Sequence, residues 1–208
     1  PCSSGGREMR ADPAGVRAVY DRNAVAFDAR RRGSRMETGW ISRFAGLLPD
    51  GAEVLDLGCG SGEPVARLLL DGGFRVTGAD FSRAMLGIAR QTFPCAEWIE
   101  ADMRDLALGR TFDGIVAWHS IFHLTVEEQR AALPKIAAHL RPGGVLMMTL
   151  GLTEGETDGQ VGQDRVYHAS LDAADYRRIL AGQGVPVTDF VVDDPETGGA
   201  NILMARRP

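Results

Sequence analysis

Cysteine, lysine and long apolar runs are scarce in this sequence. Its 208 residues include three cysteines, Cys2, Cys59 and Cys95, and their spacing fits neither a disulfide framework nor a zinc site. No stretch reaches the ~18 to 20 apolar residues needed to cross a membrane, and the N-terminal region has no apolar segment resembling a signal peptide. We therefore expect a cytoplasmic protein with no metal centre and no membrane partner.

Basic residues are too few and too scattered for a surface that binds polyanions. Lys135 is the only lysine beside 22 arginines, and the formal net charge is −5. Nucleic-acid binding needs a basic stripe, and only the cluster Arg30-Arg31-Arg32 with Arg35 comes near to one. We expect no nucleic-acid partner, and we interpret this cluster either as a solvated helix face or as part of a ligand site.

The remaining composition, with 44% hydrophobic and 25% charged residues, is typical of one α/β domain that can bury a core. We divide the chain into a flexible N-terminal segment, 1–13, and a single domain, 14–208. Within the domain, residues 14–50 are expected to form a helical cap. Residues 151–170 are expected to form a glycine-rich, polar insert on the substrate side, without helical or strand periodicity.

Hydrophobic periodicity and capping residues predict strands that alternate with helices. The expected strand segments are 53–57, 75–80, 97–100, 112–124, 145–150, 185–193 and 201–206. The expected helices are 14–29, 36–48, 63–71, 83–91, 126–140 and 172–183. Ser82 is the expected N-cap of one helix, and Thr125 with Glu128 forms a capping box for another. The alternation predicts a parallel sheet covered on both faces, and the tight turn before the last strand makes the final pair antiparallel.

The most informative stretch is Glu53–Gly62, EVLDLGCGSG, in which an apolar run breaks into three glycines at alternate positions. It predicts a buried strand that enters a tight turn before a helix, where glycine tolerates positive φ and lets a ligand approach the backbone. A dinucleotide fingerprint would need its third glycine where Glu63 or Val65 stands. A carboxylate in the first helical turn would also repel a phosphate. The turn therefore favours a nucleoside with an amino-acid tail, and an NAD-dependent oxidoreductase is the disfavoured alternative.

Acids stand at the ends of the first three strands, namely Asp56, Asp80 and Asp102, and here the chain resembles the class I S-adenosylmethionine-dependent methyltransferases of the small-molecule type. The resemblance covers most of the length, because the fourth strand and the turn of LRPGGVLMMTLG also follow in the family's order. It implies a Rossmann-like, doubly wound, seven-stranded sheet with an antiparallel last strand. It also implies S-adenosyl-L-methionine as the cofactor and S-adenosyl-L-homocysteine as the product.

The resemblance implies a set of cofactor contacts. Asp80 is expected to bind the ribose diol and Asp102 the adenine amino group. Asp56 is expected to lie near the ammonium of the amino-acid tail, and Arg31 or Arg30 near its carboxylate. The complete expected set is Tyr20, Arg31, Asp56, Gly58, Cys59, Gly60, Gly62, Asp80, Phe81, Asp102, Met103 and Trp118.

Three histidines are candidates for contact with the methyl acceptor. His119 and His123, four residues apart at the end of the fourth strand, are the candidate general bases. Histidine at position 119 departs from the family, where an acid or an amide is common. The alternatives are a wall residue of the cofactor site for His119 and a packing residue for His123. His168 and Tyr167 are the expected substrate residues, with a structural turn as the alternative.

These observations predict an enzyme that moves a methyl group from S-adenosylmethionine to an O, N or C nucleophile of a small molecule by in-line displacement. Nucleobase methylation is disfavoured, because WHSIFH stands where an amide clamp such as N-P-P-Y would be needed. The alternatives are a non-catalytic domain that binds S-adenosylmethionine or S-adenosylhomocysteine, and a protein methyltransferase. The expected assembly is a monomer or a homodimer.

Overall fold

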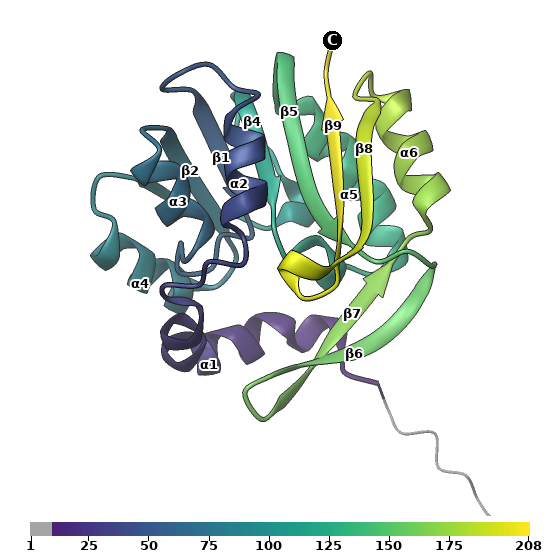
Figure 1. Cartoon of the computed structure of the whole chain (residues 1–208). Helices are drawn as coiled ribbons and strands as arrows, with labels where there is room; N and C mark the ends of the chain where they lie inside the picture. The colour runs from purple at the N-terminus through teal and green to yellow at the C-terminus, as the bar shows by residue number, and fades with distance from the viewer. Residues whose placement is uncertain (1–9) are drawn as a thin grey trace, which may run out of the picture.

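One seven-stranded sheet organises the protein (Figure 1), and the computed structural model describes residues 10–208. Its strands are β1 (Glu53–Leu57), β2 (Arg75–Asp80), β3 (Glu97–Glu100), β4 (Phe112–Ala117), β5 (Leu140–Leu150), β8 (Val187–Asp194) and β9 (Ala200–Arg206). Their order is β3-β2-β1-β4-β5-β9-β8. The first five strands are parallel, and β9 pairs antiparallel with both β5 and β8. The predicted doubly wound sheet with a reversed last strand is confirmed.

Helices cover both faces of this sheet. They are α1 (Val16–Arg31), α2 (Thr38–Ala45), α3 (Val65–Asp71), α4 (Arg83–Thr92), α5 (Val126–Ala138) and α6 (Ala173–Gly182). Alternate residues of β1 serve the two faces: Val54 packs in the core that contains α2, α3 and α4, whereas Leu55 and Leu57 pack in the core that contains α5 and α6. Burial on both faces explains why Val54, Leu55 and Leu57 are all apolar, and Asp56 is the buried polar exception in this strand.

The helix ends follow the capping residues in the sequence. The Ser82 hydroxyl accepts a hydrogen bond from the Met85 N–H, and both bonds of the Thr125–Glu128 capping box are present. The third helix begins at Val65 rather than Glu63, because Pro64 occupies its N-cap position and the glycine turn continues to that residue. None of the helices in the described part of the chain is long and apolar enough to span a bilayer.

The segment after β5 forms a two-stranded antiparallel ribbon, β6 (Gly155–Val161) and β7 (Asp164–Ser170). The expectation that this insert lacks regular structure is therefore wrong. The side chains of β6 are mostly exposed, so its sequence shows no alternation, whereas Val166 and Ala169 of β7 are buried. Gly162, at φ 62°, allows the turn between the two strands.

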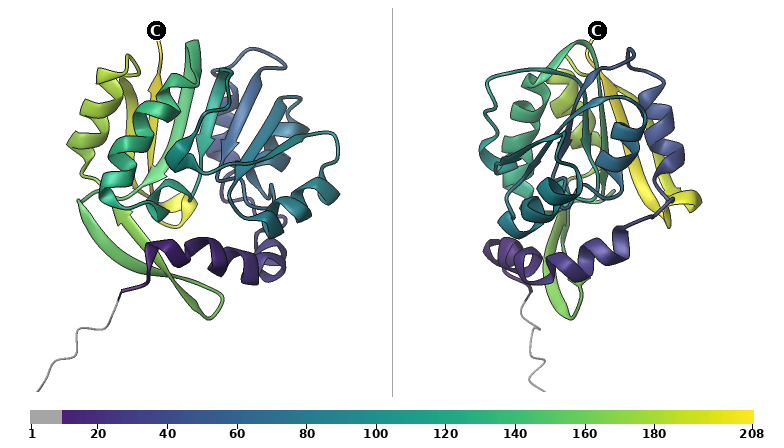
Figure 2. Two further views of the ribbon diagram at one scale, coloured as in Figure 1. Left: turned by 180° about the vertical axis from the view of Figure 1, so that it is seen from behind. Right: turned by 90° about the vertical axis from the view of Figure 1, so that its left-hand side faces the viewer.

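Helix α1 lies across the carboxyl ends of the parallel strands (Figure 2) and is tied to α4. The Asp21 carboxylate accepts hydrogen bonds from the Ser82 hydroxyl at 2.6 Å and from the Ala84 N–H at 3.3 Å. An acid at this point complements the exposed N–H groups and the dipole at the start of α4. The first helix is thereby fixed as a roof over the strand ends.

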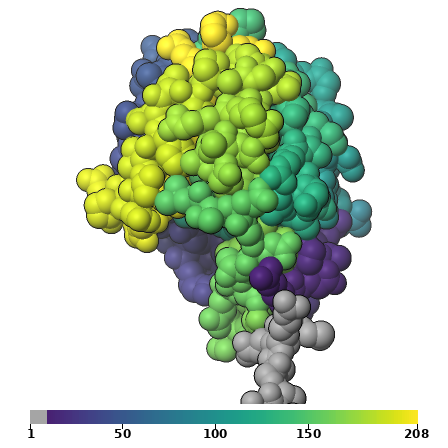
Figure 3. All heavy atoms as spheres, turned by 90° about the vertical axis from the view of Figure 1, so that its right-hand side faces the viewer, coloured from purple at the N-terminus to yellow at the C-terminus, as the bar shows by residue number. Residues whose placement is uncertain are grey.

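The β6–β7 ribbon fastens the other side of this roof, and Figure 3 shows it against the start of α1 on the molecular surface. The Asn23 amide donates to the Asp164 carboxylate at 2.7 Å, and Arg22 lies 3.3 Å from the same carboxylate. The Ala11 N–H donates to Asp158 at 2.8 Å. The segment 1–13 was expected to be flexible. Its residues 1–9 lie outside the described part of the chain, and its residues 10–13 include Ala11, which makes this hydrogen bond to Asp158.

Gln129 of α5 joins three elements beneath this ribbon, and we predict that it is important for stability. Its amide donates to the carbonyl oxygens of Leu124 and Ala169 and accepts from the Tyr176 hydroxyl, with no exposed surface. Gln129→Ala leaves these groups unpaired and should lower the free energy of unfolding by about 2 to 4 kcal/mol. Denaturant unfolding measures the change. The exposed Gln91→Ala is the matched control, and equal losses for the two variants would contradict this account.

Candidate functional site

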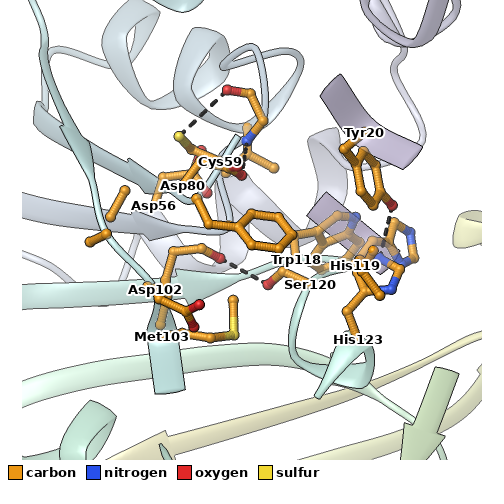
Figure 4. A pocket seen from close by; sticks show the side chains of 18 of the residues that line it. Tyr20, Asp56, Cys59, Asp80, Asp102, Met103, Trp118, His119, Ser120 and His123 are labelled. Atoms are coloured by element: carbon orange, nitrogen blue, oxygen red, sulfur yellow. Dashed lines mark hydrogen bonds between the residues drawn. The ribbon is translucent and has the colours of Figure 1, made fainter. Parts of the chain in front are cut away.

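A cavity lies where the carboxyl ends of the parallel strands meet α1 (Figure 4), and it holds about 940 Å³ of space with its open mouth included. Eleven of the twelve expected cofactor residues line it: Tyr20, Arg31, Asp56, Gly58, Cys59, Gly60, Asp80, Phe81, Asp102, Met103 and Trp118. Segments that are far apart in the sequence therefore converge on one site.

The glycine turn is shaped by packing as much as by ligand access. Gly58 and Gly60 have φ of 74° and 53°, a region that L side chains rarely adopt. A Cβ on Gly58 would lie 2.3 Å from the Cβ of Ser120, and one on Gly62 would lie 2.8 Å from the ring of Trp98. Gly62, the one expected residue that does not line the cavity, is therefore needed for close contact with β3.

Asp80 is buried between the glycine turn and the start of α4. One carboxylate oxygen accepts from the Gly60 N–H at 2.9 Å, and the other accepts from the Ser82 N–H at 2.7 Å. Burial raises the pKa of this carboxyl to about 6, against the lowering effect of these two hydrogen bonds. Each oxygen keeps a further lone pair, so the carboxylate can still accept two hydroxyl groups from a ligand.

Asp56 and Trp118 each have a buried polar atom without a partner among the described residues. These atoms are Oδ2 of Asp56 and Nε1 of Trp118, and both residues line the cavity. Burial, together with the charge of Asp80, raises the pKa of Asp56 to about 8. Unpaired buried polar groups are costly, so the pair suits a ligand that brings a cation and an acceptor.

Arg31 is held in place from behind. Its guanidinium donates to Glu37, which is 1% exposed and also accepts from the Ser34 hydroxyl at 2.7 Å. Burial works to raise the pKa of Glu37, but the hydrogen bond from Ser34 and the charge of Arg31 outweigh it and lower the pKa. The carboxylate therefore stays ionised and fixes the arginine at the cavity wall.

Asp102 has a partner that sequence reasoning missed. The Arg104 guanidinium donates hydrogen bonds to both carboxylate oxygens of Asp102, from Nε to one at 2.9 Å and from Nη2 to the other at 2.6 Å. Burial works to raise the pKa of Asp102, but these bonds lower it overall. A ligand amino group would thus meet a carboxylate that is already oriented.

Two histidines lie beside Tyr20 on the cavity wall. The His123 ring has Nε2 2.8 Å from the Tyr20 hydroxyl and Nδ1 3.1 Å from the Tyr167 carbonyl oxygen. His119 has a left-handed backbone, at φ 50°, and its N–H donates to the Thr149 hydroxyl at 2.7 Å. Burial lowers the pKa of His119 to about 4 and that of His123 to about 3.

The two expected substrate residues lie behind this wall. His168 packs against Phe122 and His123, with ring centroids 4.5 Å and 4.9 Å apart. The Tyr167 side chain is buried, and it contributes its carbonyl oxygen to His123. Neither residue lines the cavity, and their role toward a substrate stays a prediction.

Several lining residues were not predicted, including Val16, Phe27, Arg104 and Ser120. The Ser120 hydroxyl donates to the Leu57 carbonyl at 2.8 Å and braces the turn against the end of β4. Nothing in the local sequence marks these residues, because their position depends on how α1 and the strand ends meet.

The strand order and the antiparallel last strand define a Rossmann-like fold of the type found in methyltransferases. Comparison with known families agrees, since residues 54–144 match the family model described as a methyltransferase domain. The matched segment is less than half of the 208 residues, and it contains the glycine turn, nearly all of β1 and the strands β2 to β4.

Individual relatives resemble parts of this chain. Trans-aconitate 2-methyltransferase of Azoarcus sp. (strain BH72) is 40% identical over 104 residues, which are 50% of this chain and 40% of that protein. The dTDP-3-amino-3,4,6-trideoxy-alpha-D-glucopyranose N,N-dimethyltransferase of Streptomyces venezuelae is 36% identical over 121 residues, 57% of this chain and 51% of that protein. The chain thus matches about half the length of these relatives or less.

A solved structure extends the likeness of the fold to nearly the whole chain. CalS10, an amino pentose methyltransferase from Micromonospora echinaspora, has a TM-score of 0.71 at 24% identity, covering 88% of this chain and 96% of that chain. At this identity the likeness concerns the fold.

The pKa of Asp56 predicts a pH dependence of stability in the ligand-free protein. Its pKa is 3.8 in the unfolded chain and about 8 in the fold. The folded state therefore binds this proton more tightly. The resulting stabilisation is complete below about pH 4, declines as the pH rises and is lost above about pH 8.

We predict that Asp56→Asn, which cannot titrate, gains thermal stability relative to the wild type as the pH rises from about 5 to about 8. Thermal unfolding of both proteins across this interval measures the difference. Asp50→Asn, at an exposed position, is the control and should show no such trend. A difference between Asp56→Asn and wild type that is constant with pH would contradict the assignment.

Proposed function

We propose that this chain transfers the methyl group of S-adenosylmethionine to an O, N or C nucleophile of a small molecule. The observation that carries the proposal is the buried, unpaired Asp56 Oδ2, which lies beside Asp80 in a cavity at the glycine turn. S-adenosylmethionine combines an ammonium for the first carboxylate with a ribose diol for the second. When bound there, it supplies an activated methyl group on a sulfonium.

The residues present fit the rest of such a molecule. Asp102, oriented by Arg104, suits the adenine amino group. Phe81 and Met103 line the same cavity and suit the two faces of the ring. Arg31 suits the carboxylate of the amino-acid tail, because a guanidinium binds a carboxylate well even when a second carboxylate holds it from behind.

A phosphorylated cofactor fits less well. Glu63 precedes α3 at the position where a dinucleotide fold would leave room for a pyrophosphate. Its side-chain carboxylate is 2% exposed and is paired with Arg67 at 2.9 Å. Nearby positive charge is thus already partly neutralised, which supports a nucleoside ligand without phosphates.

The enclosure of the site supports a small acceptor. Helix α1 and the β6–β7 ribbon roof the strand ends, and their contacts through Asn23, Asp164 and Asp21 hold them there. The names of the relatives describe methylation of an organic acid and of an amino sugar, which are both small molecules. Alignment of the acceptor with the methyl group can supply roughly 7 to 11 kcal/mol of the barrier through proximity and orientation.

Isothermal titration calorimetry with S-adenosylmethionine, S-adenosylhomocysteine and NADH tests the cofactor assignment. We expect heat from the first two ligands and none from NADH. Release of S-adenosylhomocysteine in the presence of an acceptor panel then separates an enzyme from a domain that only binds the cofactor. If NADH binds and the other two ligands do not, the result would instead support an NAD-dependent oxidoreductase.

We predict that Asp80→Ala weakens the binding of S-adenosylmethionine by about 100-fold or more, because it removes both hydrogen bonds to the ribose diol. Each hydrogen bond to a charged group contributes about 1.5 to 3 kcal/mol, and about 1.4 kcal/mol corresponds to a factor of ten in affinity. Calorimetry measures the dissociation constant, and thermal unfolding verifies that the variant is folded. Asp71→Ala, at an exposed position on α3, is the control. An unchanged dissociation constant for Asp80→Ala would refute the ribose assignment.

A further inference from the structure

The hydrogen bonds around His123 fix which of its nitrogens carries a proton. Its Nδ1 lies 3.1 Å from the Tyr167 carbonyl oxygen, which can only accept. In the neutral ring, Nδ1 therefore carries the hydrogen, and the bare Nε2 accepts from the Tyr20 hydroxyl at 2.8 Å. Both nitrogens are occupied, so His123 has no free lone pair to offer an acceptor.

His119 is constrained in the opposite sense. The Thr149 hydroxyl, 2% exposed, already accepts from the His119 N–H, so its own hydrogen needs a buried acceptor. Within the described residues that acceptor is Nδ1 of His119, at 3.3 Å. Nδ1 is then the bare nitrogen and Nε2 carries the hydrogen. His119 lines the cavity, where its free ring nitrogen is a donor rather than a base.

The groups around the two imidazoles do not supply a base in their place. The Tyr20 hydroxyl already donates a hydrogen bond to His123, and Arg31 is a cation bound to Glu37. Glu37 is turned away from the cavity wall by Arg31 and Ser34. His168 packs behind His123, and it does not line the cavity.

We propose that residues 10–208 provide no general base on the methyl-accepting side of this site: His119 donates its Nε2–H to the acceptor molecule, and His123 is a positioning residue that holds Tyr20. The acceptor atom must then be nucleophilic as it binds, without loss of a proton to the protein. This chemistry belongs to an unprotonated amine or a carboxylate and excludes an unactivated alkyl hydroxyl. The inference rests on the proposed methyl transfer and narrows its substrate class.

The transfer balances without a protein base. The lone pair of the nitrogen or oxygen forms the new bond to the methyl carbon as the carbon–sulfur bond breaks, and that electron pair leaves with sulfur as a neutral thioether. An amine acceptor becomes an ammonium ion, which can release its proton to water. A carboxylate acceptor becomes an ester, and no proton moves.

Nitrogen-15 NMR of the histidine rings tests the proposal without knowledge of the acceptor. The protein has four histidines, and His139 is an internal reference because its Nδ1 faces the Lys135 carbonyl and its Nε2 accepts from the Leu108 N–H. We expect a protonated Nδ1 in His123 and a protonated Nε2 in His119 from about pH 5.5 to about pH 8, because burial lowers the pKa of both rings. A bare Nε2 in His119, or its titration within this interval, would overturn the proposal.

Substitution of Thr149 provides a matched test of the tautomer. Thr149→Val keeps the shape and removes the hydroxyl that donates to Nδ1, so the His119 ring should change to a mixture of tautomers. Its spectrum is read against the unchanged His139 signal. A His119 signal identical to that of the wild type would show that the hydroxyl does not set the tautomer, and would count against the proposal.

An isosteric pair at position 119 gives the kinetic test. Asparagine and aspartate both tolerate the left-handed backbone, but only asparagine has an N–H donor. With a donor role, His119→Asn keeps turnover within about tenfold of the wild type, while His119→Asp falls by about 100-fold or more. If His119 were a base, its loss would cost about 100- to 10,000-fold, and aspartate would be the better substitute.

Benzylamine, phenylacetate and benzyl alcohol are the acceptors for this comparison, read by S-adenosylhomocysteine release. Methylation of benzylamine would identify an amine acceptor, and methylation of phenylacetate would identify a carboxylate acceptor. Methylation of the alcohol by the wild type would overturn the proposal. If none of the three accepts a methyl group, the NMR result decides. Failure to bind S-adenosylmethionine would overturn the proposed function, while the proton positions would still be measured.

Discussion

The Asp80 carboxylate, buried between two loops, is the contact on which the site depends. It joins the Gly60 N–H of the glycine turn to the Ser82 N–H at the start of α4. Two backbone segments that would otherwise expose unpaired N–H groups are thereby tied through one side chain. Burial, with the charge of this carboxylate, raises the pKa of Asp56, whose unpaired oxygen lies in the same cavity. The ionised form of Asp56 is therefore unfavourable in the ligand-free fold, and a cationic ligand beside it would stabilise that form.

The roof over this cavity is assembled from segments that have little reason to order alone. Helix α1 has few buried residues of its own, and the β6–β7 ribbon is a two-stranded unit, which is marginal in isolation. Asp21 binds α1 to the N-terminus of α4, and Asn23 binds it to the ribbon. His123 adds a third link, since it touches Tyr20 of α1 and the carbonyl of Tyr167 in β7. Closure of the site and order of the ribbon are therefore coupled.

Much of the architecture could be predicted because its signals are local. The apolar run of β1, the N-cap at Ser82 and the capping box at Thr125 each act within a few residues, and the structure contains all three. The insert 151–170 was mispredicted, because an exposed ribbon can take polar residues on most of its positions and its pairing depends on contact with α1. Arg104 was missed for a similar reason: its grip on Asp102 depends on the short helical turn that follows β3.

The sequence alone determined the order of strands and helices, the glycine turn and the acids at the strand ends, because each of these is encoded by residue spacing within one element. Tertiary structure alone decided which groups bind those acids. Backbone N–H groups of two loops donate to Asp80, and Arg104 donates to Asp102. No described residue donates a hydrogen bond to Oδ2 of Asp56. Tertiary structure also decided the protonation of the histidines, since Thr149 and Tyr167 reach His119 and His123 from distant strands. Burial and hydrogen-bond partners arise between elements, and no spacing rule within one element contains them.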